Sequence, residues 1–128
     1  MGFKQATTMI GNAANFEQVP ATAGESYTLV LSGGAATKCG ATAMPEFICQ
    51  QQLSGAGAGD QLAVTRVSEL QELETTLSAA GTALKIGDKV TLHTDGEQVT
   101  ATTASGVFMI SAILDTAGGG KVRGYFRR

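Results

Sequence analysis

The sequence contains no tryptophan and few other aromatic residues, with two tyrosines and five phenylalanines in 128 residues. A chain of this length makes one domain. Hydrophobic residues form 43% of the chain, but many of them are alanine, so large side chains for a core are scarce. Association with other chains is a natural supplement to such a small core, and we therefore expect a homo-oligomer.

Charged residues are also scarce, at 16% of the chain with a net charge of −2, against roughly 25% in soluble domains. So little positive charge does not fit a nucleic-acid binder that neutralises phosphates, although the last residues are locally basic. The sequence has no apolar run typical of a secretory signal and none long enough to cross a bilayer. We therefore expect a soluble protein made in the cytoplasm, with no nucleic-acid or membrane partner.

The chain has two cysteines, Cys39 and Cys49, and one histidine, His93. Three soft ligands without a short CxxC spacing do not predict a zinc site. We expect two small thiols packed in β-structure, with no metal and no cofactor. A turn at Met44-Pro45 would bring the cysteines opposite each other and make a disulfide geometrically possible, but a cytoplasmic compartment argues against it.

Residues 1–24 show neither helical nor strand periodicity, and their apolar side chains occur singly. We interpret this segment as an extended N-terminal arm. It is either a disordered tail or a segment docked on a neighbouring chain, since the spaced aromatics favour docking. Under the docking interpretation, the candidate contacts to a neighbouring chain are Phe3, Phe16 and Val19.

Residues 25–128 carry alternating patterns separated by glycine-rich turns, which predict a single β domain. Strands are expected at about 26–32, 37–42, 46–53 and 60–67, with a flexible loop at 55–59. The stretch 68–78 is ambiguous, because Leu70, Leu73 and Leu77 fit a helix while Leu73, Thr75 and Leu77 fit a strand. We favour a strand for its second half, since Thr75-Thr76 lowers helix propensity.

The dipeptide Asp95-Gly96 predicts a β-hairpin with a two-residue type I′ turn. Its register places Leu92 opposite Val99 and His93 opposite Gln98. An apolar face then contains Val90, Leu92, Val99 and Ala101, and a polar face contains Thr91, His93, Gln98 and Thr100. We interpret His93 as a surface or interface residue, because an exposed hairpin face does not shelter a nucleophile and its base.

The stretch Val107–Leu114 is apolar on both faces and predicts a strand buried on two sides, by the core alone or by the core and another subunit. Its candidate subunit-packing residues are Val107, Phe108, Met109, Ile110, Ile113 and Leu114. The chain ends in a predicted strand whose inward side chains are Val122, Gly124 and Phe126, and whose outward ones are Arg123, Tyr125 and Arg127. This basic end either discourages strand aggregation or docks on an anionic partner.

Together these patterns predict an all-β fold, a small antiparallel barrel or sandwich with an extended arm. The sequence contains no phosphate loop, dinucleotide fingerprint, HExxH or GxSxG motif. With no convincing catalytic residues in the sequence, we expect that the protein is not an enzyme.

The run Leu84-Lys-Ile-Gly-Asp-Lys-Val-Thr-Leu-His-Thr-Asp-Gly-Glu-Gln-Val-Thr-Ala-Thr-Thr-Ala-Ser-Gly-Val107, with Glu72–Ser78 before it and Gly120–Phe126 after it, resembles the C-terminal part of tailed-bacteriophage head decoration (capsid cement) proteins. The resemblance implies a small β-rich protein of the virion that binds the outer surface of an assembled head, through the major capsid protein, and stabilises it. It also implies a trimer without cofactor or active site, in which the arm residues Phe3, Phe16 and Val19 contact the capsid or a neighbour. The alternative is a small β-barrel that binds a ligand or host surface through loops 55–59 and 118–120.

Overall fold

The computed structural model describes residues 3–8, 17–20, 28–32, 34–49 and 61–127. In these segments the chain forms ten strands and no helix, and every strand ladder is antiparallel, which confirms the all-β prediction. The strands are β1 Lys4–Thr8, β2 Glu17–Pro20, β3 Thr28–Ser32, β4 Ala35–Lys38, β5 Phe47–Ile48, β6 Gln61–Arg66, β7 Gln71–Thr76, β8 Lys89–Val90, β9 Phe108–Ile113 and β10 Lys121–Phe126.

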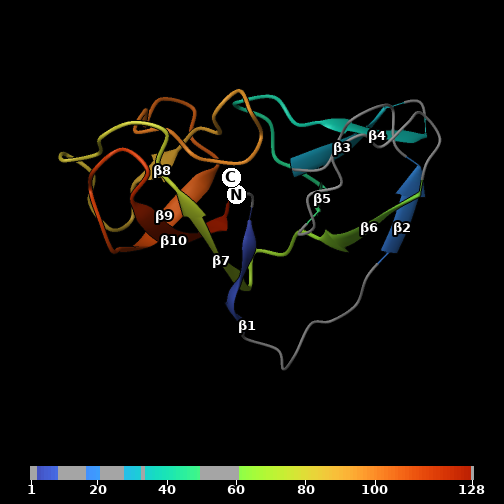
Figure 1. The fold of residues 1–128 in the computed structure, drawn as a ribbon, viewed down its shortest axis with the longest axis horizontal. Helices are drawn as coiled ribbons and strands as arrows, with labels where there is room; N and C mark the ends of the chain where they lie inside the picture. Colours follow the sequence, from blue (N-terminus) through green and yellow to red (C-terminus); the bar gives the residue numbers. More distant parts are fainter. Residues whose placement is uncertain (1–2, 9–16, 21–27, 33, 50–60, 128) are drawn as a thin grey trace.

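The strands form two five-stranded sheets (Figure 1). We call the first the terminal sheet, with strand order β1-β7-β10-β9-β8, and the second the inserted sheet, with order β2-β6-β5-β3-β4. The chain leaves the terminal sheet after β1, builds the whole inserted sheet, and returns at β7. The described parts of residues 1–24, β1 and β2, are therefore paired strands of the two sheets.

The inserted sheet curls so that its edge strands β2 and β4 approach each other, as Figure 1 shows at the side away from the terminal sheet. Among the described residues no ladder joins these two strands. Strands β3, β5 and β6 fall within the expected strand segments, and β4 overlaps the segment expected at 37–42. The curvature follows from the right-handed twist of antiparallel strands.

The main core lies on the inner face of the terminal sheet. In β10, Val122, Gly124 and Phe126 are buried and the residues between them are not, which confirms the predicted alternation. Phe126 packs edge-on against Phe108, with ring centroids 5.1 Å apart. The other buried members include residues from both sheets and from the hairpin: Phe3, Cys39, Ile48, Leu73, Leu77, Leu84, Val90, Leu92, Val99, Val107 and Ile110.

The ambiguous stretch 68–78 forms a turn followed by strand β7. Leu73, Thr75 and Leu77 are all buried on one side of it, so the strand prediction for its second half is confirmed. Antiparallel pairing with both β1 and β10 decides the choice, because a strand in mid-sheet satisfies its backbone groups on two sides.

The hairpin at residues 90–101 has the predicted register, because Leu92 and Val99 form an antiparallel bridge. The prediction of a type I′ turn is wrong. That turn requires positive φ at both central residues, whereas Gly96 has φ of 73° and Asp95 is not among the positive-φ residues. The Gly96 N–H instead donates to the His93 carbonyl at 3.0 Å, so Thr94 and Asp95 are central and only glycine takes the left-handed conformation.

Candidate interaction surface

The hairpin tip around His93 is organised by one carboxylate. Oδ1 of Asp95 accepts the backbone N–H groups of Glu97 at 2.8 Å and Gln98 at 3.2 Å, and Oδ2 accepts Nε2 of Gln98 at 2.9 Å. This is the Asx-turn arrangement, in which an aspartate completes the hydrogen bonds of its own turn. Asp95 thus caps the turn, as expected from its position in the hairpin.

The pKa of Asp95 reflects this role. Partial burial of the Asp95 carboxylate raises its pKa. The hydrogen bonds from Gln98 and Glu97 and the Coulombic interaction with His93 lower the pKa by more, so it lies below 3.8. Hydrogen bonds to the charged form favour that form. The carboxylate is therefore ionised and engaged at neutral pH.

The hydroxyl groups near the hairpin also have structural partners. Thr76 Oγ1 donates to Oε1 of Gln98 at 3.1 Å, which ties the hairpin tip to β7. Thr91 and Thr100 hydroxyls lie 2.8 Å apart across the hairpin. His93 is half-buried, and its backbone N–H donates to the Gln98 carbonyl at 2.9 Å. These hydrogen bonds on the polar face hold the two sides of the hairpin together and attach its tip to β7.

Both cysteines are buried, as predicted for packed thiols. The Cys39 thiol donates to the Ala43 carbonyl at 3.1 Å, with the Gly40 carbonyl at 3.4 Å. Burial raises its pKa to about 11, so the thiol stays protonated and weakly nucleophilic at neutral pH. Within the described segments, no group of His, Cys, Asp and Glu side chains has the arrangement of a metal site.

The outer face of the terminal sheet carries a shallow hollow of about 200 Å³, lined by Glu69, Leu70, Met109, Tyr125 and Arg127. We call it the β9–β10 hollow. Met109 and Tyr125 are cross-strand partners that point away from the core. Leu70 comes from the turn before β7 and is 48% exposed. The hollow therefore has apolar walls with one carboxylate and one guanidinium at its rim.

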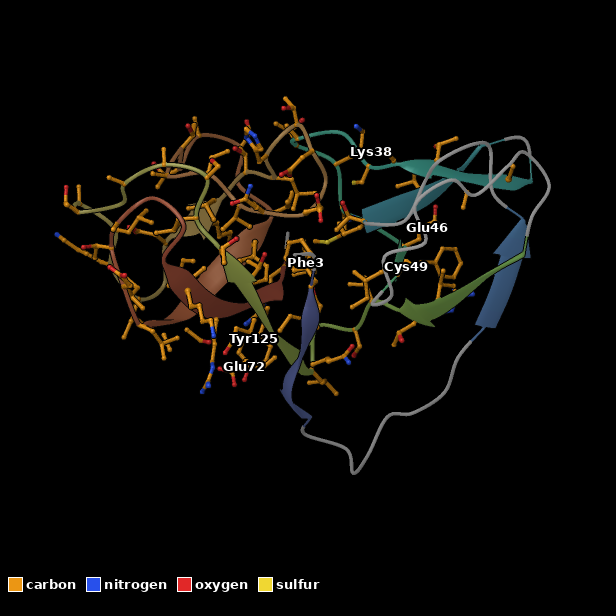
Figure 2. All side chains as sticks on the ribbon, viewed as in Figure 1. Phe3, Lys38, Glu46, Cys49, Glu72 and Tyr125 are labelled. Atoms are coloured by element: carbon orange, nitrogen blue, oxygen red, sulfur yellow. The ribbon has the colours of Figure 1, made fainter. Side chains whose placement is uncertain are left out.

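The same face is held by two polar contacts to β7, one from β9 across β10 and one from β10 itself. Ser111 Oγ donates to Glu72 Oε2 at 2.6 Å, and Arg123 Nε donates to Glu74 Oε1 at 3.1 Å. Both carboxylates lie on β7, so the contacts fix β7, β9 and β10 relative to one another. Figure 2 shows Glu72 and Tyr125 at the same border of the terminal sheet. The hollow therefore lies on a part of the sheet where side-chain contacts hold neighbouring strands together.

A second hollow, of about 310 Å³, lies among the loops that precede β8 and follow the hairpin. Its walls include Gly81, Leu84 and Asp88. Asp88 Oδ2 accepts the Lys85 backbone N–H at 2.9 Å, so this carboxylate also stabilises its own loop. The glycine-rich loop 118–120 lies beside these walls, since a Cβ at Gly118 would lie 3.7 Å from the backbone nitrogen of Ala80, which lines the hollow.

The residues predicted as arm contacts lie in different places. Phe3 is 2% exposed and packs between Phe108 and Phe126, as its central position in Figure 2 illustrates. Its ring belongs to the core of its own chain. Val19 lies in β2, opposite Leu62. Phe16 lies outside the described residues.

The residues predicted for subunit packing also differ in burial, since some lie in the core and others are accessible. Val107, Phe108 and Ile110 are buried in the core of the chain, so the core covers one of the two faces predicted to be buried. Met109 and Leu114 remain accessible, the latter at 55%. Ile113 is partly buried against the core. Accessible surface for a partner is therefore concentrated at Met109 and Leu114.

The sequence prediction missed Leu70 and treated Tyr125 only as an outward residue. In the sequence, Leu70 fits one face of a possible helix with Leu73 and Leu77, and this pattern hides its position in the turn. Tyr125 alternates outward from β10, but its proximity to Leu70 depends on how β7 approaches β10 through the sheet. Only the assembled sheet brings the two residues to one hollow.

In the described segments, no helix is long and apolar enough to traverse a bilayer. Comparison with known proteins gives no matching family model, no matching curated protein and no matching solved structure.

Proposed function

We propose that this protein is a structural decoration protein that binds the outer surface of an assembled phage head and stabilises it. The observation that carries the proposal is the resemblance of residues 72–78, 84–107 and 120–126 to capsid cement proteins. These three segments lie next to one another in the structure: β7 pairs with β10, and Leu77 bridges Val99 of the hairpin. The resemblance thus covers one folded unit rather than scattered strand motifs.

The β9–β10 hollow supports the proposal because its composition suits a protein partner. Aliphatic and aromatic side chains at its centre, with charged groups at the rim, are the usual arrangement of a protein interface. Leu70 and Tyr125 provide apolar area, while the guanidinium of Arg127 can donate two parallel hydrogen bonds to a carboxylate of the partner. We propose that this hollow receives a surface segment of the major capsid protein.

We further propose that the protein acts as a homotrimer within the virion, on the outer capsid surface. Three equivalent hollows on one particle strengthen weak single contacts by factors on the order of 100 or more. In this proposal the curled inserted sheet is a partly open barrel, supported by the approach of β2 to β4. The sheets act as a rigid body that presents the hollow.

Co-sedimentation tests the proposal, using heads assembled from the major capsid protein encoded in the same genome. The wild-type protein is expected to pellet with the heads and to form trimers by light scattering. Leu70→Asp places a charge in the hollow and is expected to weaken binding roughly tenfold or more, with stability changed by at most about 0.5 kcal/mol. Folding of each variant is checked by circular dichroism.

Ile86→Asp is the matched control, because Ile86 is 71% exposed and does not line the hollow. It is expected to bind heads like the wild type. A wild-type protein that stays in the supernatant at saturating head concentration contradicts the decoration function. Equal binding by the Leu70 and Ile86 variants contradicts the hollow as the contact while leaving the function in place.

The loop hollow of about 310 Å³ favours a second candidate, a module that binds a ligand or host surface. The described loop 118–120 lies beside Ala80 in the wall of this hollow, whereas loop 55–59 lies outside the described residues. Thr82→Arg would fill the hollow and remove such binding, measured by retention on immobilised host-cell envelopes. Retention of the wild type without head binding would favour this candidate over decoration.

A further inference from the structure

Strand β1 is attached to the rest of the molecule in a way that makes it separable. It is an edge strand, and β7 is its one ladder partner among the described strands. The next strand in the sequence, β2, belongs to the other sheet (Figure 1). Removing β1 from β7 therefore breaks no other ladder between described strands.

The ladder between β1 and β7 is irregular. Its register shifts between Gln5 and Thr7, where Lys4 pairs with Glu74 but Thr7 pairs with Glu72. Such a bulge interrupts the regular exchange of hydrogen bonds. Backbone pairing alone therefore holds β1 less firmly than the uninterrupted pairing of β7 with β10.

The principal anchor of β1 is the side chain that precedes it. Phe3 is 2% exposed, and its ring centroid lies 5.6 Å from that of Phe108 and 5.1 Å from that of Phe126. Phe108 and Phe126 come from β9 and β10, and both are fully buried. The two rings form an aromatic socket that belongs to the terminal sheet and that accepts one phenylalanine from an incoming strand.

We propose that the edge of β7 that pairs with β1, together with the aromatic socket, forms a strand-exchange site, which accepts β1 and Phe3 of a second copy of this chain. An exchanged strand makes the same ladder and the same ring contacts, so exchange adds little energetic penalty beyond association itself. Eight residues separate β1 from β2 in the sequence, and eight residues reach at most about 30 Å, so exchange requires two copies in contact.

The proposal is independent of phage-head binding, because it concerns how copies of the chain join. It is tested by mixing two full-length variants, Lys4→Cys and Glu74→Cys, one of them carrying a size tag. These positions are Cα partners across the β1–β7 ladder. The variants are unfolded together, refolded, and treated with a short thiol-to-thiol crosslinker.

Strand exchange predicts a covalent heterodimer whose fraction rises with protein concentration while the dimer is the minor species. A mixture of Lys4→Cys with Gln71→Cys is the control, because these two positions are not partners in the ladder. It is expected to give much less heterodimer, since Gln71 pairs with Thr8 at the other end of β1. Phe3→Ala, added to the Lys4→Cys chain, is expected to reduce the heterodimer several-fold. The wild type controls for Cys39 and Cys49, which are buried.

A double variant, Lys4→Cys with Glu74→Cys in one chain, shows whether the pair reacts. If it crosslinks only within monomers and the mixture gives no heterodimer at any concentration, the proposal is overturned. If Glu74→Cys does not fold because it loses its contact with Arg123, Thr8→Cys with Gln71→Cys replaces the pair. A folded protein in which neither pair crosslinks at all also overturns the proposal, since β1 would not lie on β7.

Discussion

Gly124 occupies a position in the middle of β10 where a side chain has no space. A Cβ there would overlap the carbonyl oxygen of Met109 and lie 2.7 Å from Cε2 of Phe108. Backbone on the neighbouring strand cannot move without breaking the β9–β10 ladder. The glycine thus lets β10 approach β9 closely above a large aromatic ring.

Gly124→Ala is therefore expected to destabilise the protein by about 1–3 kcal/mol, the usual penalty for overpacking a core. Gly40→Ala is the matched control, because a Cβ at Gly40 meets nothing within 4 Å. It is expected to change the free energy of unfolding by no more than about 0.5 kcal/mol. Urea denaturation measures both, and equal midpoints for the two variants would contradict the close approach.

Asp95 predicts an acid dependence of stability. Its pKa is below 3.8 in the folded protein, so the unfolded chain takes up the proton first as the pH falls. The contribution of Asp95 is present above about pH 4 and is lost as the pH falls through the lowered pKa. Asp95→Ala is expected to lower the free energy of unfolding by about 1 kcal/mol at pH 7 and by less at pH 2.5.

Thermal melts at pH 7 and pH 2.5 check this expectation. Asp95→Asn keeps an oxygen that accepts the N–H groups of Glu97 and Gln98 but carries no charge, so it separates the hydrogen bonds from the charge. It is expected to fall between the wild type and Asp95→Ala at pH 7. A destabilisation by Asp95→Ala that is the same at both pH values would show that ionisation of Asp95 plays no part.

Among the elements, the hairpin tip is joined to strand β3 of the other sheet. Thr28 is fully buried, and both its Oγ1 and its backbone N–H donate to the Gly96 carbonyl, at 2.9 Å and 3.2 Å. A Cβ at Gly96 would lie 3.3 Å from Thr28 Oγ1. A glycine in the left-handed conformation thus allows the two elements to meet.

Thr28→Val keeps the shape of the side chain and removes one of these hydrogen bonds. We expect a loss of about 1 kcal/mol and faster amide hydrogen exchange at the hairpin tip. Thr37→Val is the control, because Thr37 Oγ1 makes only a long contact of 3.4 Å to the Val30 carbonyl. Unchanged exchange at Gly96 in Thr28→Val would show that the contact does not hold the hairpin.

In the whole molecule, the two sheets share one core. Ile48, from the inserted sheet, is 1% exposed and belongs to the same buried cluster as Leu73 and Phe126 of the terminal sheet. Cys39, from the segment after β4, belongs to it too. Side chains that share a core lose their contacts together, so the two sheets are expected to unfold as one cooperative unit.

Ile48→Ala tests this cooperation. The substitution is expected to destabilise the protein by about 2–5 kcal/mol and to lower the urea midpoint of amide signals in β5 and in β10 by the same amount. Two-dimensional NMR spectra recorded through the unfolding transition provide the midpoints. A shifted midpoint for β5 with an unchanged midpoint for β10 would mean that the sheets are stabilised separately.

The sequence by itself determined those features that depend on neighbouring residues along the chain. The buried alternation of Val122, Gly124 and Phe126 follows from the two-residue period of a strand. The opposition of Leu92 and Val99 follows from the position of Asp95-Gly96 between two alternating segments, although Thr94 and Asp95 are the central residues of the turn. In both cases the hydrophobic pattern fixes which face meets the core, because a one-residue slip would expose every apolar side chain.

The tertiary structure decided which distant segments became neighbours. The residues around Phe3 had no period of their own, and only the open edge of β7 and the rings of Phe108 and Phe126 gave them a strand partner and a buried site. The β9–β10 hollow likewise arises where Leu70 meets Tyr125. Local patterns encode periodicity and turns, whereas these contacts depend on the order of strands in a sheet, which no single stretch of sequence contains.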